Sequence, residues 1–311
     1  MRFRLCLVSL LSLLFASIAQ DAQAAEKVTI GYTPGPDYLA AFTAKDQGLF
    51  EKHGIDATLQ FTASANPIPA ALLSDSLQIG TPTVPILLAA ASNGLGLKVI
   101  GANIETGGSF HLSGVLVRND EQVNSAKDLE GKTVAVPGFN SFLHMLFVKW
   151  LQNHGADPAK VHVVEIAIPG MMDAMKSKQV DASLPVDPFM ARIIGSNTGH
   201  VLSYYIDDFP PGILPTIYVA TSDYVQKHPD VIKGFREARI EGLAYHEAHP
   251  EAAVESLAKH MNVTPEIAKT LTMPHFITDV KPAQIKFWID LMTEQKVLAT
   301  PIDPNSVIAQ P

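Results

Sequence analysis

Residues 27–80 constrain the fold of this chain more than any other stretch. Lys27–Tyr32 is apolar and rich in β-branched residues, which predicts a buried strand, and the glycines and prolines that follow predict a loop. A helix is expected to begin at Asp37 and to end at Gly48, and a second strand is expected over Ile55–Phe61. This order forms a βαβ unit, so we predict a parallel sheet with a ligand site at the ends of its strands.

The first 24 residues have the composition of an export signal. Arg2 and Arg4 precede an apolar core over Leu5–Ile18, and Ala22-Gln23-Ala24 is an A-x-A cleavage site. The apolar core is short for a membrane span, and an uncleaved N-terminal anchor is the alternative. We therefore predict that residues 1–24 are a cleaved signal peptide and that the mature chain is periplasmic.

Charge and cysteine usage exclude several classes of function. The only cysteine is Cys6, inside the signal, so the mature chain has no thiol for disulfide, metal or nucleophile chemistry. The formal net charge is −8, and removal of a signal with two arginines and one aspartate makes it −9. Such an acidic chain is not expected to bind nucleic acid or an anionic membrane. Its length suits two lobes of ordinary domain size.

Three strand ends in the first part of the chain lead into helices through small or hydroxyl residues. They are Thr33–Asp37, Ser64–Asn66 and Thr81–Thr83. The last of these lies between a strand expected at residues 77–80 and a helix expected at Val84–Ser92, and a further strand is expected at Leu112–Val117. Parallel strands end at one edge of a sheet, so these helix starts are expected to converge, and their free N–H groups would bind an oxyanion without lysine or arginine. The alternative is that these residues only cap their helices.

Three phrases resemble the periplasmic substrate-binding proteins of ABC importers. The first is the opening G-Y-x-P, followed by G-L-F-E-K-H-G-I-D (Gly48–Asp56) and A-L-L-x-x-x-L-Q-I-G. The others are D-L-E-G-K-T-V-A-V (Asp128–Val136) and V-D-A-S-L-P-V-D-P (Val180–Pro188). The branch that they resemble most is the nitrate/sulfonate/taurine and thiamine-pyrimidine group. One departure is that Asp75 and Gln78 stand where the family usually has Gly and Asp.

The resemblance implies a two-lobed α/β fold of the type II periplasmic binding proteins, in which each lobe is a mainly parallel sheet flanked by helices. Lobe 1 would comprise residues 25–117 and 217–311, and lobe 2 residues 118–216. Two linking segments, near residues 117–119 and 214–217, would then permit hinge closure on a ligand.

The function that the resemblance implies is capture of a small organic acid or zwitterion, with sulfonates and taurine first. The chain would be a monomer, would catalyse nothing and would need no cofactor. It would deliver its ligand to an ABC permease with its ATPase. The alternatives are binding of a thiamine-precursor pyrimidine, a pyrimidine-synthase-like enzyme of the same fold, and a binding module that serves a membrane sensor.

Candidate ligand contacts lie near the predicted strand ends. They are Tyr32, Thr33, Asp37, Tyr38, Ser64, Asn66, Thr81, Thr83, His111, Phe139, Asn140, Ser141, His144 and Asp187. Asp37 and Asp187 are read first as helix N-caps. If either faces the ligand instead, a purely anionic ligand is disfavoured and an amine gains a partner. Aromatic side chains in the cleft would favour a flat ligand and disfavour nitrate.

Two pairs of residues have the spacing of a catalytic or metal site, but the rest of such a site is missing from the sequence. Ser141 and His144 share a helix face, but no G-x-S-x-G phrase is present, so Ser141 is read as a helix cap and a hydrolase is not expected. His246 and His249 have a spacing that suits a metal, but no third ligand is evident. Phosphate-loop and dinucleotide fingerprints are absent from the sequence.

Overall fold

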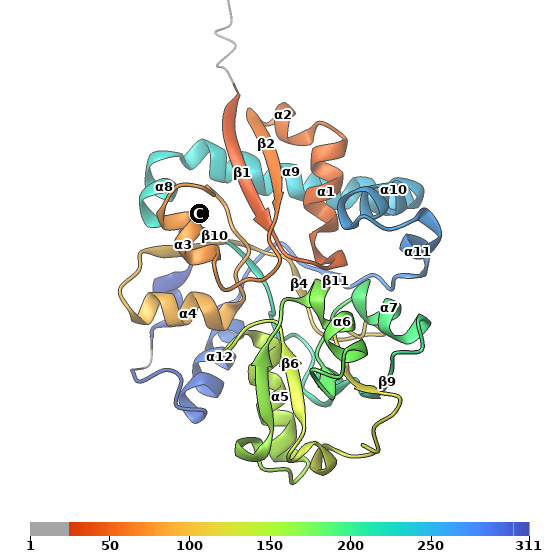
Figure 1. Ribbon diagram of the computed structural model, residues 1–311. Coiled ribbons are helices and arrows are strands. Elements are labelled where there is room, and N and C mark those ends of the chain that lie inside the picture. Colours follow the sequence, from red (N-terminus) through yellow and green to blue (C-terminus); the bar gives the residue numbers. More distant parts are fainter. Residues whose placement is uncertain (1–24, 301, 311) are drawn as a thin grey trace, which may run out of the picture.

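The computed structural model describes residues 25–300 and 302–310, so the predicted signal peptide lies outside the described residues. The chain forms two lobes, each built on its own strands (Figure 1). β1 (Glu26–Tyr32) and β2 (Ile55–Phe61) lie in the upper lobe, and β6 (Thr133–Val136) and α5 (Phe142–Asn153) lie in the lower lobe. The predicted two-lobed α/β architecture is confirmed.

The strands of the first lobe form one discontinuous sheet. β1 pairs in parallel with β2, and Ile30 of β1 forms an isolated parallel bridge with Ile79. Gly80 bridges to β10 (Ile217–Thr221), which runs antiparallel to β3 (Leu97–Ala102). The predicted βαβ unit is therefore confirmed, whereas the strand expected at residues 77–80 is reduced to single bridges.

Helices cover the first sheet because their apolar faces are buried against it and against one another. α1 (Leu39–Asp46) packs on α9 (Pro229–Ala248) and α10 (Pro250–Met261). The α1–α9 contact is so close at Gly242 that a Cβ there would lie 2.4 Å from the carbonyl oxygen of Ala40. The other helices of this part are α2 (Leu49–Lys52), α3 (Ile68–Leu73), α4 (Val84–Ser92), α8 (Ser222–Lys227) and α11 (Pro265–Thr270).

The second lobe contains a five-stranded mixed sheet. Its order is β7 (His162–Glu165), β6, β8 (Ala182–Ser183), β5 (Val115–Arg118) and β9 (Gly199–Ser203). β6 is parallel to β7 and β8, whereas β5 is antiparallel to β8 and β9. Its helices are α5, α6 (Met171–Lys176) and α7 (Phe189–Gly195).

The chain crosses between the lobes near β5. The boundary predicted after Val117 divides β5, although both pairing partners of this strand belong to the second sheet. We propose that the first crossing lies before Val115, and that the second lies in residues 211–216, before β10. Beside these segments, β4 (Ile104–Glu105) pairs with β11 (His275–Phe276).

α12 (Pro282–Glu294) contacts both lobes. It packs on α4, and the buried Trp288 donates a hydrogen bond from Nε1 to the carbonyl oxygen of Leu214, at 2.6 Å. At its C-terminal end, Lys149 of α5 pairs with Glu294, and the side chain of Gln295 donates to the carbonyl oxygen of Met145. α12 therefore holds the second crossing segment in place.

Short 3-10 helices complete the fold. They are η1 (Pro36–Tyr38), η2 (Ala126–Leu129), η3 (Pro158–Lys160), η4 (Ile168–Gly170), η5 (Tyr205–Asp208) and η6 (Pro304–Val307). Within residues 25–300 and 302–310, none of the helices has the length and apolar character that crossing a bilayer requires.

Candidate functional site

A small inner cavity lies where the two lobes meet. Its volume is about 50 Å³. Its lining comes from the β1–α1 loop, the segment before α3, the starts of α4 and α5, and the segment before β10. The lining residues are Thr33, Pro34, Gly35, Asp37, Ala63, Ser64, Ala65, Asn66, Thr83, Leu112, Pro137, Ser141, Phe142, Leu143, Ile168, Val186 and Thr216.

The three helix starts of the first lobe converge on this cavity as expected, but they offer few N–H donors. Each carries proline in its first turn, namely Pro36 in η1, Pro69 in α3 and Pro85 in α4. Proline has no N–H, and the Val84 N–H of α4 already donates to the carbonyl oxygen of Pro215. An oxyanion site built from these three helix starts, as the sequence suggested, is therefore poorly supplied with donors.

Asp37 lies in the first turn of η1 and is 4% exposed. The N-cap position of η1 is Gly35, and no side chain caps this helix or α1, so the expected N-capping role of Asp37 is wrong. Its Oδ2 instead accepts a hydrogen bond from the Oγ1 of Thr216, at 3.0 Å. Burial raises the pKa of the Asp37 carboxyl to about 7, and the hydrogen bond from Thr216 opposes this rise.

Gly35 makes room for this carboxyl. Its φ is +151°, a conformation that side chains disfavour, and a Cβ there would lie 2.1 Å from Oδ1 of Asp37. The Pro34-Gly35-Pro36 sequence therefore fixes a loop that folds tightly over the acid. Beside it, the Oγ1 of Thr83 is buried and has no hydrogen-bond partner among the described residues.

The second lobe presents the N-terminus of α5 to the cavity. Ser141 is the N-cap, and its Oγ accepts from the N–H of His144, so the predicted cap is confirmed. Phe142 and Leu143 follow in the first turn, and both line the cavity. Their N–H groups have no acceptor within the described part of the chain. A helix N-terminus also carries partial positive charge, so this end of the cavity attracts an anion.

His144 supports the loop before α5. Its Nδ1 accepts a hydrogen bond from the Asn140 N–H at 3.0 Å, and burial lowers its pKa to about 4. The imidazole is therefore neutral at physiological pH and adds no charge to the site. Because the Ser141 hydroxyl is bonded to the backbone of His144 and not to its ring, the two residues do not form a nucleophile–base pair.

The lobes touch beside the cavity at Asn66 and Gly138. A Cβ on Gly138 would lie 2.6 Å from Oδ1 of Asn66, so a side chain at this position would displace the Asn66 amide. A second contact closes the outer side, where Nη2 of Arg192 on α7 donates to the carbonyl oxygen of Asn262 after α10 at 3.3 Å. The conformation in the structure is therefore one with the two lobes in contact.

A larger outer cavity of about 450 Å³ adjoins the inner one and shares Pro34 and Gly35 with it. Aromatic side chains line it from both lobes, with Tyr32 and Phe61 on one side and Phe189 on the other. It therefore gives the inner cavity an approach between the lobes.

The structure brings together six of the predicted site residues. Thr33, Asp37, Ser64, Asn66, Thr83 and Ser141 line the inner cavity. Tyr32 lines the outer cavity, and Tyr38 lies buried behind Thr33, to which its hydroxyl is hydrogen-bonded at 2.7 Å. Thr81 is buried and donates to the carbonyl oxygen of Gly31.

The remaining predicted residues line neither cavity. His111 is stacked on Tyr204 and paired with Asp207. Phe139 is 47% exposed, and Asn140 lies beside it with φ of +58°. The N-cap of α7 is Pro188 and no side chain caps it, so Asp187 is not the N-cap that was expected, although its carboxyl accepts a hydrogen bond from the N–H of Ala191 in the first turn.

A comparison with protein families shows which family this chain belongs to. Residues 35–253, more than half of the chain, match the family model described as NMT1/THI5 like. The chain belongs to the NMT1/THI5-like family. The predicted membership in the nitrate/sulfonate/taurine and thiamine-pyrimidine group is thereby confirmed.

Relatives of this NMT1/THI5-like protein include binding proteins of known name. The taurine-binding periplasmic protein of Escherichia coli (strain K12) is 27% identical over 238 residues, which cover 76% of this chain and 71% of that protein. The alkanesulfonate-binding protein SsuA from Xanthomonas axonopodis pv. citri, bound to MOPS, superposes with a TM-score of 0.78 at 18% identity and covers 93% and 100% of the two chains. The aliphatic sulphonate binding protein SsuA from Escherichia coli superposes with a TM-score of 0.74 at 21% identity, and the match covers 91% of this chain and 97% of that chain. These structures establish the periplasmic binding protein fold.

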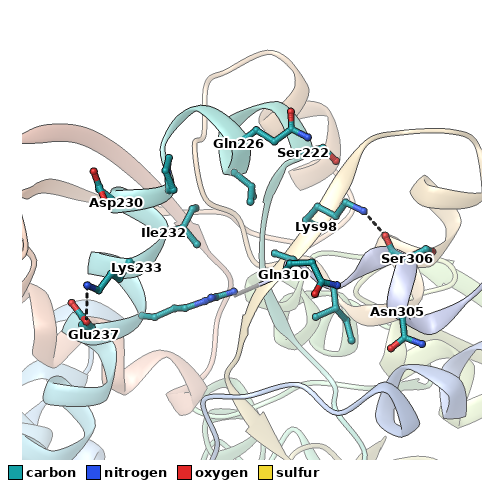
Figure 2. Close-up of a pocket in the computed structure, with 15 residues that line it drawn as sticks. Lys98, Ser222, Gln226, Asp230, Ile232, Lys233, Glu237, Asn305, Ser306 and Gln310 are labelled. Carbon is teal, nitrogen blue, oxygen red and sulfur yellow. Dashed lines mark hydrogen bonds and ion pairs between the residues drawn. The ribbon is translucent and has the colours of Figure 1, made fainter.

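A cavity of about 950 Å³ in the NMT1/THI5-like protein is a separate feature (Figure 2). It lies between α8, α9, β3 and the segment after η6, all in the first lobe. Lys98 donates to the carbonyl oxygen of Ser306, and Lys233 pairs with Glu237. The second lobe contributes nothing to this groove, so lobe closure cannot seal it. No group of three His, Cys, Asp or Glu side chains suited to a metal occurs in the described residues.

Sequence reasoning missed Thr216, Phe142 and Leu143 at the inner cavity. Phe142 and Leu143 were placed correctly at the start of a helix, but their role depends on backbone N–H groups, which leave no residue-type signal. Thr216 lies in L-P-T-I just before β10, and a hydroxyl at a strand start facing the predicted strand ends was the available signal.

Proposed function

We propose that this chain is the periplasmic solute-binding component of an ABC importer. It captures a small organic acid or zwitterion of the sulfonate or taurine type in the inner cavity, and passes it as a monomer to a permease with its ATPase. The observation that carries the proposal is a small cavity between the lobes, lined from both of them, with polar side chains of the first lobe and the free N–H groups of α5 at one end. A ligand held there is bound by both lobes at once, as capture by lobe closure requires.

The size of the inner cavity supports a small ligand. One water molecule needs roughly 10–15 Å³ of cavity volume, so a cavity of about 50 Å³ holds only a small solute. Phe142 is the one aromatic side chain in its lining among the described residues. A flat pyrimidine would therefore lack a pair of stacking partners here, which favours the acid or zwitterion.

A thermal-shift screen of residues 25–311 tests the proposal. The panel holds taurine, alkanesulfonates, small amino acids, nitrate and aminopyrimidines, with an uncharged diol of similar size as the control. A ligand at 100 times its Kd should stabilise the fold by about 2.7 kcal/mol, because it binds only the folded state. For a chain of this size we expect a rise in Tm of roughly 4–5 °C. No shift with any member, while the protein is folded, would contradict the proposed capture function.

A further inference from the structure

The inner cavity has two chemically different ends that belong to different lobes. The first lobe contributes a buried carboxyl, that of Asp37, and the second lobe contributes the N-terminus of α5. No lysine or arginine lines the cavity within the described residues. A cationic partner for this carboxyl would therefore have to come from the ligand.

Asp37 has no structural task that explains its burial. It caps neither η1 nor α1, and the side chains that hydrogen-bond to its carboxyl, those of Thr216 and Tyr38, carry neutral hydroxyl groups. A buried carboxylate without a cationic partner is unfavourable, because desolvation penalises its charge. The raised pKa of the Asp37 carboxyl expresses this cost. The burial of Asp37 is explained if a bound ligand supplies the cationic partner of its carboxyl.

The polar atoms around Asp37 also lack partners. The Oγ1 of Thr83, on a side chain that is 4% exposed, is unbonded in the described part of the chain, as is the Oδ1 of Asn66. Both residues line the same cavity as Asp37. Buried polar atoms are normally satisfied, so unbonded ones that face a cavity indicate a polar ligand. A protonated amine has three donors and would satisfy several of these acceptors together.

The opposite end of the cavity suits an acid group. α5 has twelve residues, begins without proline, and leaves the N–H groups of Phe142 and Leu143 free, unlike the helix starts of the first lobe. Sulfonate and carboxylate oxygens are both good acceptors for such a pair of donors.

We infer that Asp37 is the specificity-determining residue of the cleft and that the ligand is zwitterionic, with its cationic nitrogen on Asp37 and its acid group at the N-terminus of α5. This inference rests on the proposed capture function and narrows it to ligands that carry an amine. A zwitterion of this kind connects the lobes electrostatically, whereas an acid without an amine leaves the Asp37 carboxyl unpaired. Nitrate and simple alkanesulfonates are therefore poor ligands.

Matched pairs of probes test the role of Asp37. Each pair differs only in an amine and a hydroxyl group, as in taurine with isethionate and β-alanine with 3-hydroxypropionate, and affinities are measured by calorimetry at pH 8. In at least one pair, the amine member should bind about 10–100-fold more tightly than its partner, because a site built for a charged donor discriminates strongly against its neutral analogue. Asp37→Asn should abolish this preference, and Asp290→Asn, on the exposed face of α12, should leave it unchanged.

A second variant keeps the test decisive if Asp37→Asn does not fold. Thr216→Val retains the carboxyl but removes its hydrogen-bond donor, which raises the pKa of Asp37 further and should reduce the preference for the amine. Binding of the hydroxyl members as tightly as the amine members would overturn the inference while capture stands. If no member of any pair binds while another acid of the thermal-shift panel does, the inference fails and capture stands. If nothing in that panel binds, the proposed function fails and the inference fails with it.

Discussion

The buried carboxyl of Asp37 should make the stability of the protein depend on pH. The pKa is about 7 in the folded protein, against an ordinary value near 4 in the unfolded chain. Between these values the folded state binds more protons than the unfolded state, so the free energy of unfolding falls as pH rises from about 4 to 7 and is level above 7. The total loss is about 4 kcal/mol at most, from the conversion of one pKa unit to about 1.4 kcal/mol.

Asp37→Asn should remove this dependence. Relative to the wild type, the variant is expected to gain stability as the pH rises from 5 to about 7 and to keep that gain at pH 8, since it has no charge to desolvate at the higher pH. Urea unfolding at both pH values measures the difference, and Asp290→Asn is the control for loss of an exposed carboxylate. If the free energy of unfolding changed equally with pH in Asp37→Asn and in the wild type, burial would not raise the pKa of the Asp37 carboxyl.

The individual residues of the site were predictable where they follow from chain order and not where they depend on packing. Thr33, Asp37 and Thr83 lie at the ends of predicted strands, and the parallel pairing of β1 with β2 brings such ends to one edge. His111 also follows a strand, but its ring stacks on Tyr204 of the second lobe, outside both cavities. Only the position of that second lobe decides this, and local sequence carries no information about it.

At the scale of elements, close helix packing at Gly242 anchors α9 to α1. A Cβ at this position would lie 2.4 Å from the Ala40 oxygen and 3.0 Å from the Ala44 nitrogen, and both are backbone atoms that cannot rotate away. The two helices must therefore separate if a methyl group is added. The first lobe depends on this contact because α1 and α9 together cover its sheet.

Gly242→Ala should consequently destabilise the protein by about 1–2 kcal/mol, since overpacking costs roughly 1–3 kcal/mol and the better helix propensity of alanine returns up to about 1 kcal/mol. The matched control is Gly195→Ala at the end of α7, where a Cβ meets nothing within 4 Å. This control should be neutral or slightly stabilising. Chemical denaturation of both variants provides the measurement, and equal midpoints would contradict the packing argument.

Element boundaries followed the sequence where apolar periodicity was strong. β2 and α4 occupy the residues predicted for them, Ile55–Phe61 and Val84–Ser92. The strand expected at residues 77–80 is only a pair of bridges, and the one expected at Leu112–Val117 begins at Val115. Whether such short apolar runs become strands depends on neighbours from distant parts of the chain, such as β10 and β9.

For the whole molecule, the contact of Asn66 with Gly138 limits how closely the lobes can approach. The two residues come from opposite lobes and lie beside the inner cavity. One hydrophobic core runs from α4 and α12 into β5, β6 and α5, so the lobes stay joined on that side. We propose that the lobes open on the side of the outer cavity, where the Arg192–Asn262 hydrogen bond would break.

Gly138→Val should hold the lobes apart, because its Cβ and methyl groups would occupy the space of the Asn66 amide. We expect the affinity for the ligand found in the thermal-shift screen to fall at least tenfold, while the stability of the unliganded protein changes little, since residue 138 is not part of the core that joins the lobes. Calorimetry measures the affinity, and small-angle scattering should show that the ligand contracts the wild type but not the variant. Gly195→Val, at a position with free space, is the control. Wild-type affinity in Gly138→Val would mean that capture does not require the lobes to meet at this point.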